Sequence, residues 1–422
     1  MRRVTFTNVS ETVRSLRATS PPAENLERTV AGIVGDVRRR GDAALRYHTE
    51  RLDGVALPTE MAVPEAAMRE ALAGLAPELR AALETAAANI RAYHEREASH
   101  PWRETLAQGQ VVGQEIIPLD VAGLYVPGGL ANYPSSVLMT AIPAQVAGVR
   151  RLVVCSPPRA GGGVASGVAA ACALLGITEL FPLGGAQAVA AMAYGTESVP
   201  RCDVIVGPGN AFVTEAKRQV LGEVAIDSLA GPSEVLIVSD EHGDAAWLAA
   251  DLLAQAEHGS GAMGALLDVG GALGDEVAQR VEALTAELGV KTERTAIVAV
   301  PDVDTAVALV NEFAPEHLEL HLQDAEAVLP RVRNAGAIFL GPYTATAFAD
   351  YAAGTNHVLP TGGRARFAQG LSVAAFQKRV GVVAMDRAAA LALGGPVATL
   401  ALAEGLPAHA RSVELRVGNG QT

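Results

Sequence analysis

The alternation of short β-rich runs with alanine-rich runs of about ten residues constrains the fold of this chain more than any other feature. Strands are predicted at residues 151–155, 179–182, 203–206 and 234–239. Helices are predicted between them at residues 164–175, 186–194 and 211–221. Strands that alternate with helices of this length pair in parallel through right-handed crossovers. This stretch is therefore predicted to form a Rossmann-like sheet.

The rest of the chain extends this pattern. Residues 20–97 read as helices, β-rich runs begin near residue 110, and a mixed α/β pattern returns after residue 239. We expect an α/β fold with two Rossmann-like parallel-sheet domains, one inserted in the other, and helical N- and C-terminal extensions. The expected boundaries are an N-terminal arm at 1–19, a main α/β domain at 20–118 and 233–370, an inserted nucleotide-binding domain at 119–232, and a C-terminal helical section at 371–422.

Charge and cysteine content exclude several classes of protein. The chain has 33 Lys and Arg against 46 Asp and Glu, a net charge of −13, which repels nucleic acid and anionic lipid. Three cysteines (Cys155, Cys172 and Cys202) without a C-x-x-C motif fit a reducing compartment. The N-terminus lacks the apolar run of a signal peptide, and Gly394-Gly395-Pro396 interrupts the longest apolar stretch. We expect a soluble cytoplasmic protein without nucleic-acid or membrane partners.

Glycine-rich loops follow three of the predicted strands. They are Gly161-Gly162-Gly163, Gly184-Gly185 and Gly207-Pro208-Gly209. In open α/β sheets ligands sit at the carboxyl ends of the strands, where small residues let backbone N–H groups approach a phosphate. None of the loops is a G-x-G-x-x-G or Walker A motif, so each one alone reads as an ordinary turn. Three such loops on one sheet edge favour a nucleotide site.

The nine histidines fall into two groups by their neighbours. Five lie in charged or polar stretches and are expected to be exposed: His48, His94, His100, His242 and His321. The other four each have a Gln, Asp or Glu and a glycine or proline nearby: His258, His317, His357 and His409. The second group is typical of a site assembled from distant loops.

Gln255 and His258 are three residues apart at the end of a predicted helix, so they point the same way and can share one ion. With Asp350 and His409 they would form a nitrogen and oxygen ligand set suited to zinc. Capped helix ends and buried polar pairs explain the same residues equally simply. Spacing alone leaves both interpretations open.

Glu316 and His317 are an acid and a base adjacent in sequence, directly after a proline. At a loop or strand end both could reach one substrate, as a base and a water activator. The alternative is two exposed residues at a helix end. Residues 350–357 read as a loop that carries a second carboxylate and imidazole, Asp350 and His357; the alternative is a structural turn.

Nine short motifs, taken together, carry a resemblance to a known family. They are Val126-Pro127-Gly128-Gly129, Tyr133-Pro134-Ser135-Ser136-Val137-Leu138-Met139, Gly184-Gly185-Ala186-Gln187-Ala188, Gly207-Pro208-Gly209-Asn210, Ala230-Gly231-Pro232-Ser233-Glu234, Gln255-Ala256-Glu257-His258, Ala314-Pro315-Glu316-His317-Leu318, Gly354-Thr355-Asn356-His357-Val358-Leu359-Pro360-Thr361 and Ala403-Glu404-Gly405-Leu406-Pro407-Ala408-His409. They span nearly the whole chain in the family's order and resemble histidinol dehydrogenase.

The resemblance implies a zinc- and NAD-dependent enzyme of histidine biosynthesis. Such an enzyme oxidises L-histidinol through L-histidinal to L-histidine with two NAD, in the last step of that pathway. The resemblance also implies a homodimer in which the partner's C-terminal section completes the site.

The resemblance implies a role for twelve residues. The zinc ligands would be Gln255, His258, Asp350 and His409. His317 would be the base that takes the alcohol proton, and Glu316 would activate the water that adds to the aldehyde. Substrate contacts would come from Ser233, His357 and Glu404. Nucleotide contacts would come from Tyr125, Gln187 and Asn210.

The chain departs from the family pattern in a few places. Residues 259–263 (Gly-Ser-Gly-Ala-Met) are smaller and more apolar than the family's polar stretch, which affects how this loop packs and contacts substrate. Ala349 and Ala353 replace a common glycine and a common serine. Neither Ala349 nor Ala353 is expected to carry chemistry.

Three other functions remain open on the sequence alone. A related zinc and NAD dehydrogenase of a sulfonated diol would keep the ligand set, but Glu404 would repel a sulfonate. A zinc hydrolase would use Glu316 to activate water and would reduce no nicotinamide. A nucleotide-binding regulator would tolerate the loss of Glu316 and His317.

Overall fold

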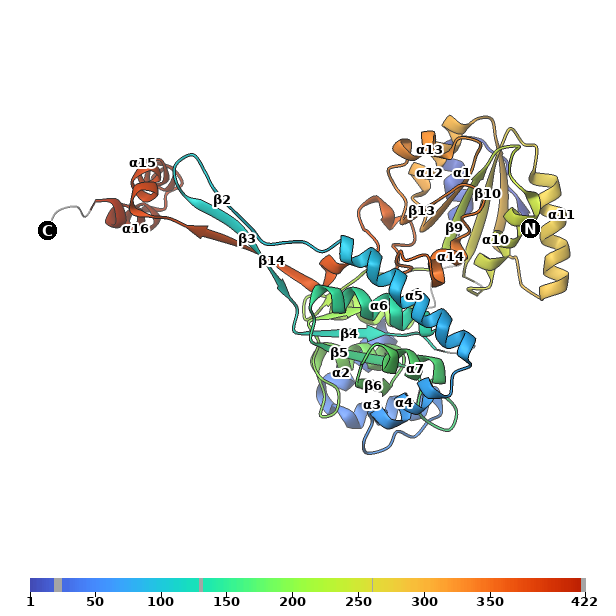
Figure 1. The fold of residues 1–422 in the computed structure, drawn as a ribbon, viewed down its shortest axis with the longest axis horizontal. Helices are drawn as coiled ribbons and strands as arrows, with labels where there is room; N and C mark the ends of the chain where they lie inside the picture. Colours follow the sequence, from blue (N-terminus) through green and yellow to red (C-terminus); the bar gives the residue numbers. More distant parts are fainter. Residues whose placement is uncertain (19–24, 129–131, 260, 419–422) are drawn as a thin grey trace. The chain divides into compact units, whose positions relative to one another are not determined.

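The computed structural model describes residues 1–18, 25–128, 132–259 and 261–418 (Figure 1). Contact clustering gives two compact units, one formed by Met1–Glu97 and Asp120–Phe376, the other by Ala98–Leu119 and Gln377–Thr422. Gly129 of the motif at 126–129, Ser260 of the segment at 259–263 and the boundary expected between residues 19 and 20 lie outside the described residues. The domain boundaries expected from the sequence stay a prediction.

The first unit contains a five-stranded parallel sheet in the order β6-β5-β4-β7-β8. Its strands are β4 (Val121–Tyr125), β5 (Arg151–Ser156), β6 (Glu179–Pro182), β7 (Val204–Val206) and β8 (Ala225–Ile226). The connecting helices are α6 (Pro134–Ala147), α7 (Ser166–Leu174), α8 (Gly185–Tyr194) and α9 (Ala211–Val220). The N-terminal helices α2 (Leu26–Arg40), α3 (Asp42–Asp53), α4 (Glu65–Ala73) and α5 (Pro77–Arg96) pack against them. The continuous apolar strands match a parallel sheet covered on both faces.

The same unit contains a six-stranded parallel sheet in the order β1-β11-β10-β9-β12-β13. Its strands are β1 (Arg2–Arg3), β9 (Glu234–Ser239), β10 (Met263–Val269), β11 (Thr295–Val300), β12 (His317–His321) and β13 (Ala337–Leu340). Its helices are α1 (Val9–Arg17), α10 (Ala245–Ala256), α11 (Gly274–Leu288), α12 (Val303–Phe313), α13 (Ala325–Val328) and α14 (Thr346–Tyr351). Short 3₁₀ helices follow at η1 (Leu329–Arg331), η2 (Arg364–Arg366) and η3 (Val373–Phe376). The expected α/β class with two parallel sheets is confirmed.

Alternation along β9 separates the two faces of this sheet. Leu236 and Val238 pack into the core beneath α1 and α12. Val235 and Ile237 pack into the core beneath α10 and α11. Because successive strand residues point to opposite faces, β9 contributes apolar side chains to the hydrophobic cores on both faces of the sheet.

The second unit is built from an antiparallel sheet in the order β14-β3-β2 and two helices. The elements are β2 (Trp102–Thr105), β3 (Val111–Pro118), β14 (Gln377–Ala384), α15 (Arg387–Ala403) and α16 (Pro407–Val417). Helices α15 and α16 pack on each other. Within the helical section expected at 371–422, α15 is one continuous helix that accommodates Pro396.

Within the helical stretch expected at 20–97, Gly74 ends α4 and Pro77 starts α5. Two expectations about local structure are wrong. Asp350 was expected in a loop, but it lies in α14. His48, His94 and His321 were expected to be exposed, but all three are buried. Among the described residues, no helix is both long and apolar enough to cross a bilayer.

Candidate active site

The backbone of Glu234, the first residue of β9, holds both Glu316 and His317. The Glu234 N–H donates to Glu316 Oε2 at 2.7 Å, and His317 Nδ1 lies 3.1 Å from the Glu234 carbonyl oxygen. The Ser233 hydroxyl also donates to Glu316 Oε2, at 2.6 Å. Arg17 pairs with the Glu234 side chain and so fixes this strand end. The two adjacent side chains are therefore held by the backbone of one residue, with His317 Nδ1 3.5 Å from Glu316 Oε2.

The hydrogen bond of His317 determines which ring nitrogen is basic. A carbonyl oxygen only accepts, so Nδ1 carries the proton and Nε2 is left with a free lone pair. His317 Nε2 is buried without a hydrogen-bond partner among the described residues and lies 4.0 Å from Asp350 Oδ1. Burial raises the pKa of the Glu316 carboxyl, while the neighbouring His317 and the bond from Ser233 lower it. An imidazole base and a carboxyl group thus share one enclosed site.

Three of the four expected metal ligands, Gln255, His258 and Asp350, line one small cavity. The ring of His258 is oriented by its Nδ1, which lies 3.3 Å from the Ala254 carbonyl oxygen, so Nε2 is the free ligand atom. Gln255 is buried, and its Nε2 atom has no partner among the described residues. Rotation of this amide puts the oxygen, which can bind a metal, in the same place. The donor set fits zinc.

The other expected site residues lie in different surroundings. His357 is oriented by the Asp350 carbonyl oxygen, 3.0 Å from its Nδ1, and burial lowers its pKa. Ser233 is engaged with Glu316. Glu404 ends α15 and His409 lies on α16, both exposed and both in the second compact unit. The structure therefore groups Gln255, His258 and Asp350, but it describes His409 in a separate unit.

The expected nucleotide contacts lie at the carboxyl edge of the five-stranded sheet. Tyr125 ends β4, and its hydroxyl accepts from the Gly185 N–H at 3.1 Å at the start of α8. Gln187 is buried in the first turn of α8, and Asn210 caps α9 by accepting from Phe212 and Val213 N–H groups. Gly207 follows β7, where a Cβ would collide with the Tyr125 carbonyl oxygen. The glycine loops bring these elements close together.

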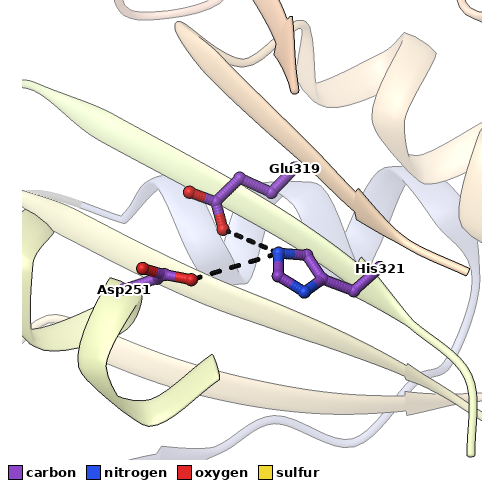
Figure 2. A group of neighbouring side chains, drawn as sticks. All are labelled: Asp251, Glu319 and His321. Carbon is purple, nitrogen blue, oxygen red and sulfur yellow. Dashed lines mark ion pairs between the residues drawn. The ribbon is translucent and has the colours of Figure 1, made fainter. Parts of the chain in front are cut away.

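Sequence reasoning missed a second cluster, formed by Asp251, Glu319 and His321. Each offers one ligand-type atom, and these atoms lie within 4.8 Å of one another, close enough to share an ion. In Figure 2 both carboxylates point at the same ring nitrogen of His321. The segment His317-Leu318-Glu319-Leu320-His321 alternates polar and apolar residues with the period of a strand. This alternation was the signal that would have predicted β12 and its polar face.

Comparisons with known proteins agree along the chain. A family model described as histidinol dehydrogenase matches residues 17–417. The histidinol dehydrogenase of Dechloromonas aromatica is 47% identical over 405 residues, covering 94% of this chain and 93% of the relative. That of Pseudomonas aeruginosa is 48% identical over 405 residues, covering 93% and 91%.

Solved structures give the same result. A crystal structure of histidinol dehydrogenase from Elizabethkingia anophelis matches with a TM-score of 0.94 and 33% identity, covering 99% of this chain and 98% of that one. An acetylating aldehyde dehydrogenase from Geobacillus thermoglucosidasius, with a TM-score of 0.51 and 14% identity, shares the fold alone. The chain belongs to the histidinol dehydrogenase family, whose members are NAD-dependent zinc enzymes.

Proposed function

We propose that this chain oxidises L-histidinol through L-histidinal to L-histidine with two NAD, in the last step of histidine biosynthesis. The observation that carries the proposal is that His317 lies next to the residues proposed to bind the metal. His317 Nε2, the free basic nitrogen, lies 4.0 Å from Asp350, which lines one cavity with Gln255 and His258. A metal-ligand set and an acid–base pair therefore adjoin each other.

In the first step, His317 Nε2 takes the proton of the alcohol group. Loss of this O–H proton, together with a hydride from the carbon that bears the hydroxyl, converts the alcohol to the aldehyde. The Glu234 carbonyl oxygen holds the ring through Nδ1, so the imidazolium that forms keeps its orientation. A histidine is suited to this task because its ordinary pKa lies near neutrality.

In the second step, Glu316 takes a proton from the water that adds to the aldehyde. The hydrate then loses a second hydride and a proton to give the carboxylic acid. The bonds from Ser233 and the Glu234 N–H hold Glu316 in place for this role. Zinc, when bound, supplies a Lewis acid that fixes the amine-bearing substrate, and NAD, when bound, accepts the hydrides.

We propose that Gln255, His258, Asp350 and His409 hold the zinc, with His409 and Glu404 supplied by the partner subunit of a homodimer. Exposed apolar side chains on the two C-terminal helices and at the N-cap of α16 support a dimer: Leu391, Val397, Leu400, Leu402, Leu406 and Leu415. Apolar patches of this kind mark interaction surfaces. Ser233, His357 and Glu404 are proposed to contact the substrate.

For the nucleotide we propose contacts with Tyr125, Gln187 and Asn210. Their common place at the carboxyl edge of the five-stranded sheet supports this, as does the helix N-terminus beside Tyr125. We also propose a cytoplasmic location, supported by the buried free thiols Cys155, Cys172 and Cys202.

The test is to supply purified zinc-loaded protein with NAD and either L-histidinol or an anionic sulfonated diol, and to follow NADH absorbance. We expect two NADH per histidinol and none from the diol. NADH from the diol alone would favour the related dehydrogenase. Product without NADH would favour a hydrolase.

A further inference from the structure

The residues Asp251, Glu319 and His321, here called the inner cluster, connect the two helices that carry the proposed zinc ligands. Asp251 lies on α10 one turn before Gln255, and positions four apart share a helix face. Glu319 Oε1 accepts from both the N–H and the hydroxyl of Thr346, at 2.9 and 2.7 Å. Thr346 is the first residue of α14, and Asp350 follows it by one turn.

All three members point toward one buried point. His317, Glu319 and His321 alternate along β12, so they face the same side of the sheet. His321 Nε2 lies 3.3 Å from Glu319 Oε2 and 4.0 Å from Asp251 Oδ2 (Figure 2). The side chains of His321 and Glu319 are 1% and 0% exposed, and that of Asp251 is 14% exposed. Solvent therefore does not compete for the contact between His321 and Glu319.

We propose that the inner cluster is a positioning device for the zinc site, in which Asp251, Glu319 and His321 hold α10 and α14 at the separation that Gln255, His258 and Asp350 require. This inference rests on the proposed ligand set. Asp251 belongs to α10, Glu319 connects to α14 through Thr346, and His321 Nε2 faces both carboxyl groups. Asp251 also lines the cavity of Gln255, His258 and Asp350, while Glu319 and His321 are proposed to act on the ligands through Thr346 and Asp251.

The Nδ1 atom of His321, free among the described residues, favours a supporting cluster over a second ion site. A metal-binding histidine usually donates its other ring nitrogen to an acceptor, as His258 does with Ala254. His321 Nδ1 has no partner among the described residues. Burial, followed by the charge of Glu319, raises the pKa of Asp251 to about 7, so this carboxyl group can hold a proton near neutrality. The proton limits the charge that the buried group carries.

The experiment measures zinc affinity by competition with a chelator, which does not depend on activity. Glu319→Ala removes the acceptor for Thr346, and we expect about a tenfold or larger loss of zinc affinity. Glu319→Gln keeps that acceptor and should lose less. His321→Gln removes the imidazole from the cluster and should also weaken zinc binding. The matched controls are Glu326→Gln and His242→Gln, which change exposed residues.

Two further readouts separate positioning from simple loss of stability. Saturating zinc should restore most of kcat in Glu319→Ala and His321→Gln, because the chemical groups remain. Melting temperature measured without zinc should not rank the variants in the same order as zinc affinity. If Glu319→Ala does not fold, His321→Gln still provides the test.

Three results would overturn the proposal. The first is wild-type zinc affinity in both Glu319→Ala and His321→Gln. The second is a turnover defect that saturating zinc does not relieve. The third is two zinc ions per wild-type chain and one in Glu319→Ala, which would make the inner cluster an ion site. Failure of the wild-type protein to bind zinc or reduce NAD would instead contradict the proposed function.

Discussion

His317 and His321 lie four residues apart on the same face of β12, and their surroundings differ in a way that fits the two proposed roles, catalysis and support. His317 Nδ1 lies 3.1 Å from a backbone carbonyl oxygen, so its second nitrogen has a free lone pair. His321 Nε2 faces two carboxylates, and its Nδ1 has no partner among the described residues. The hydrogen bond to Nδ1, rather than burial, is what differs between the two histidines.

The largest expected effect comes from the acid–base pair. His317→Ala or Glu316→Gln should lower turnover by about 10²- to 10⁴-fold, the usual contribution of a positioned acid or base. Zinc content should stay near that of the wild type, because neither residue is a proposed ligand. Steady-state NADH formation and metal analysis on the same preparations check this. Turnover near that of the wild type in both variants would contradict the proposed catalytic roles of His317 and Glu316.

The next effect concerns the metal itself. His258→Ala removes a proposed ligand whose ring is already oriented by Ala254, so zinc should be lost during dialysis and activity with it. Chelation of the wild-type protein should give the same inactive state, reversed by added zinc. Metal analysis after dialysis measures both. A His258→Ala protein that keeps its zinc would place the ion elsewhere.

A smaller effect is expected at Ser233. Its hydroxyl donates to Glu316 at 2.6 Å, a bond that favours the charged carboxylate. Ser233→Ala should raise the pKa of Glu316, because the charged carboxylate loses a hydrogen bond. The acid limb of aldehyde oxidation should move to higher pH in a pH–rate profile. An unchanged limb would show that Ser233 does not tune Glu316.

The smallest effect is the pH dependence of the wild-type protein. Burial raises the pKa of Glu316 above its ordinary 4.5, so the folded state binds its proton more tightly than the unfolded chain does. This group therefore favours folding at low pH, and its contribution is lost as the pH rises through the folded-state pKa. Activity has the opposite sign, since water activation needs the carboxylate. The rate of the second oxidation should fall as the pH is lowered, with a midpoint above pH 4.5. In Glu316→Gln this acid limb of the pH–rate profile should disappear.

Much of the fold follows from local patterns. The strands predicted at 179–182 and 234–239 have the bounds that the structure shows, because β-branched and apolar runs between turn residues are local signals. The strand β12 was not predicted as a strand, because the segment that begins with Glu316 and His317 was interpreted as a loop or strand end or, alternatively, as a helix end. The alternation of polar and apolar residues indicates a strand only when all five residues, 317–321, are considered together.

The candidate site was predictable in part. Chemistry and spacing suggested that Gln255, His258 and Asp350 could share an ion, and the structure places them around one cavity. The inner cluster was not predictable in the same way. Glu319 meets Thr346, 27 residues later, only through the packing of β12 against α14, and no sequence spacing encodes that contact. His321 was expected to be exposed because Glu319, Gln323 and Asp324 lie near it in sequence, but its side chain is buried.

The most direct test is a crystal structure of the zinc-loaded protein with anomalous scattering measured at the zinc edge. We predict one peak per chain, bounded by Gln255, His258 and Asp350 and completed by His409 of the partner subunit. A peak between Asp251, Glu319 and His321, with none at His258, would contradict the account.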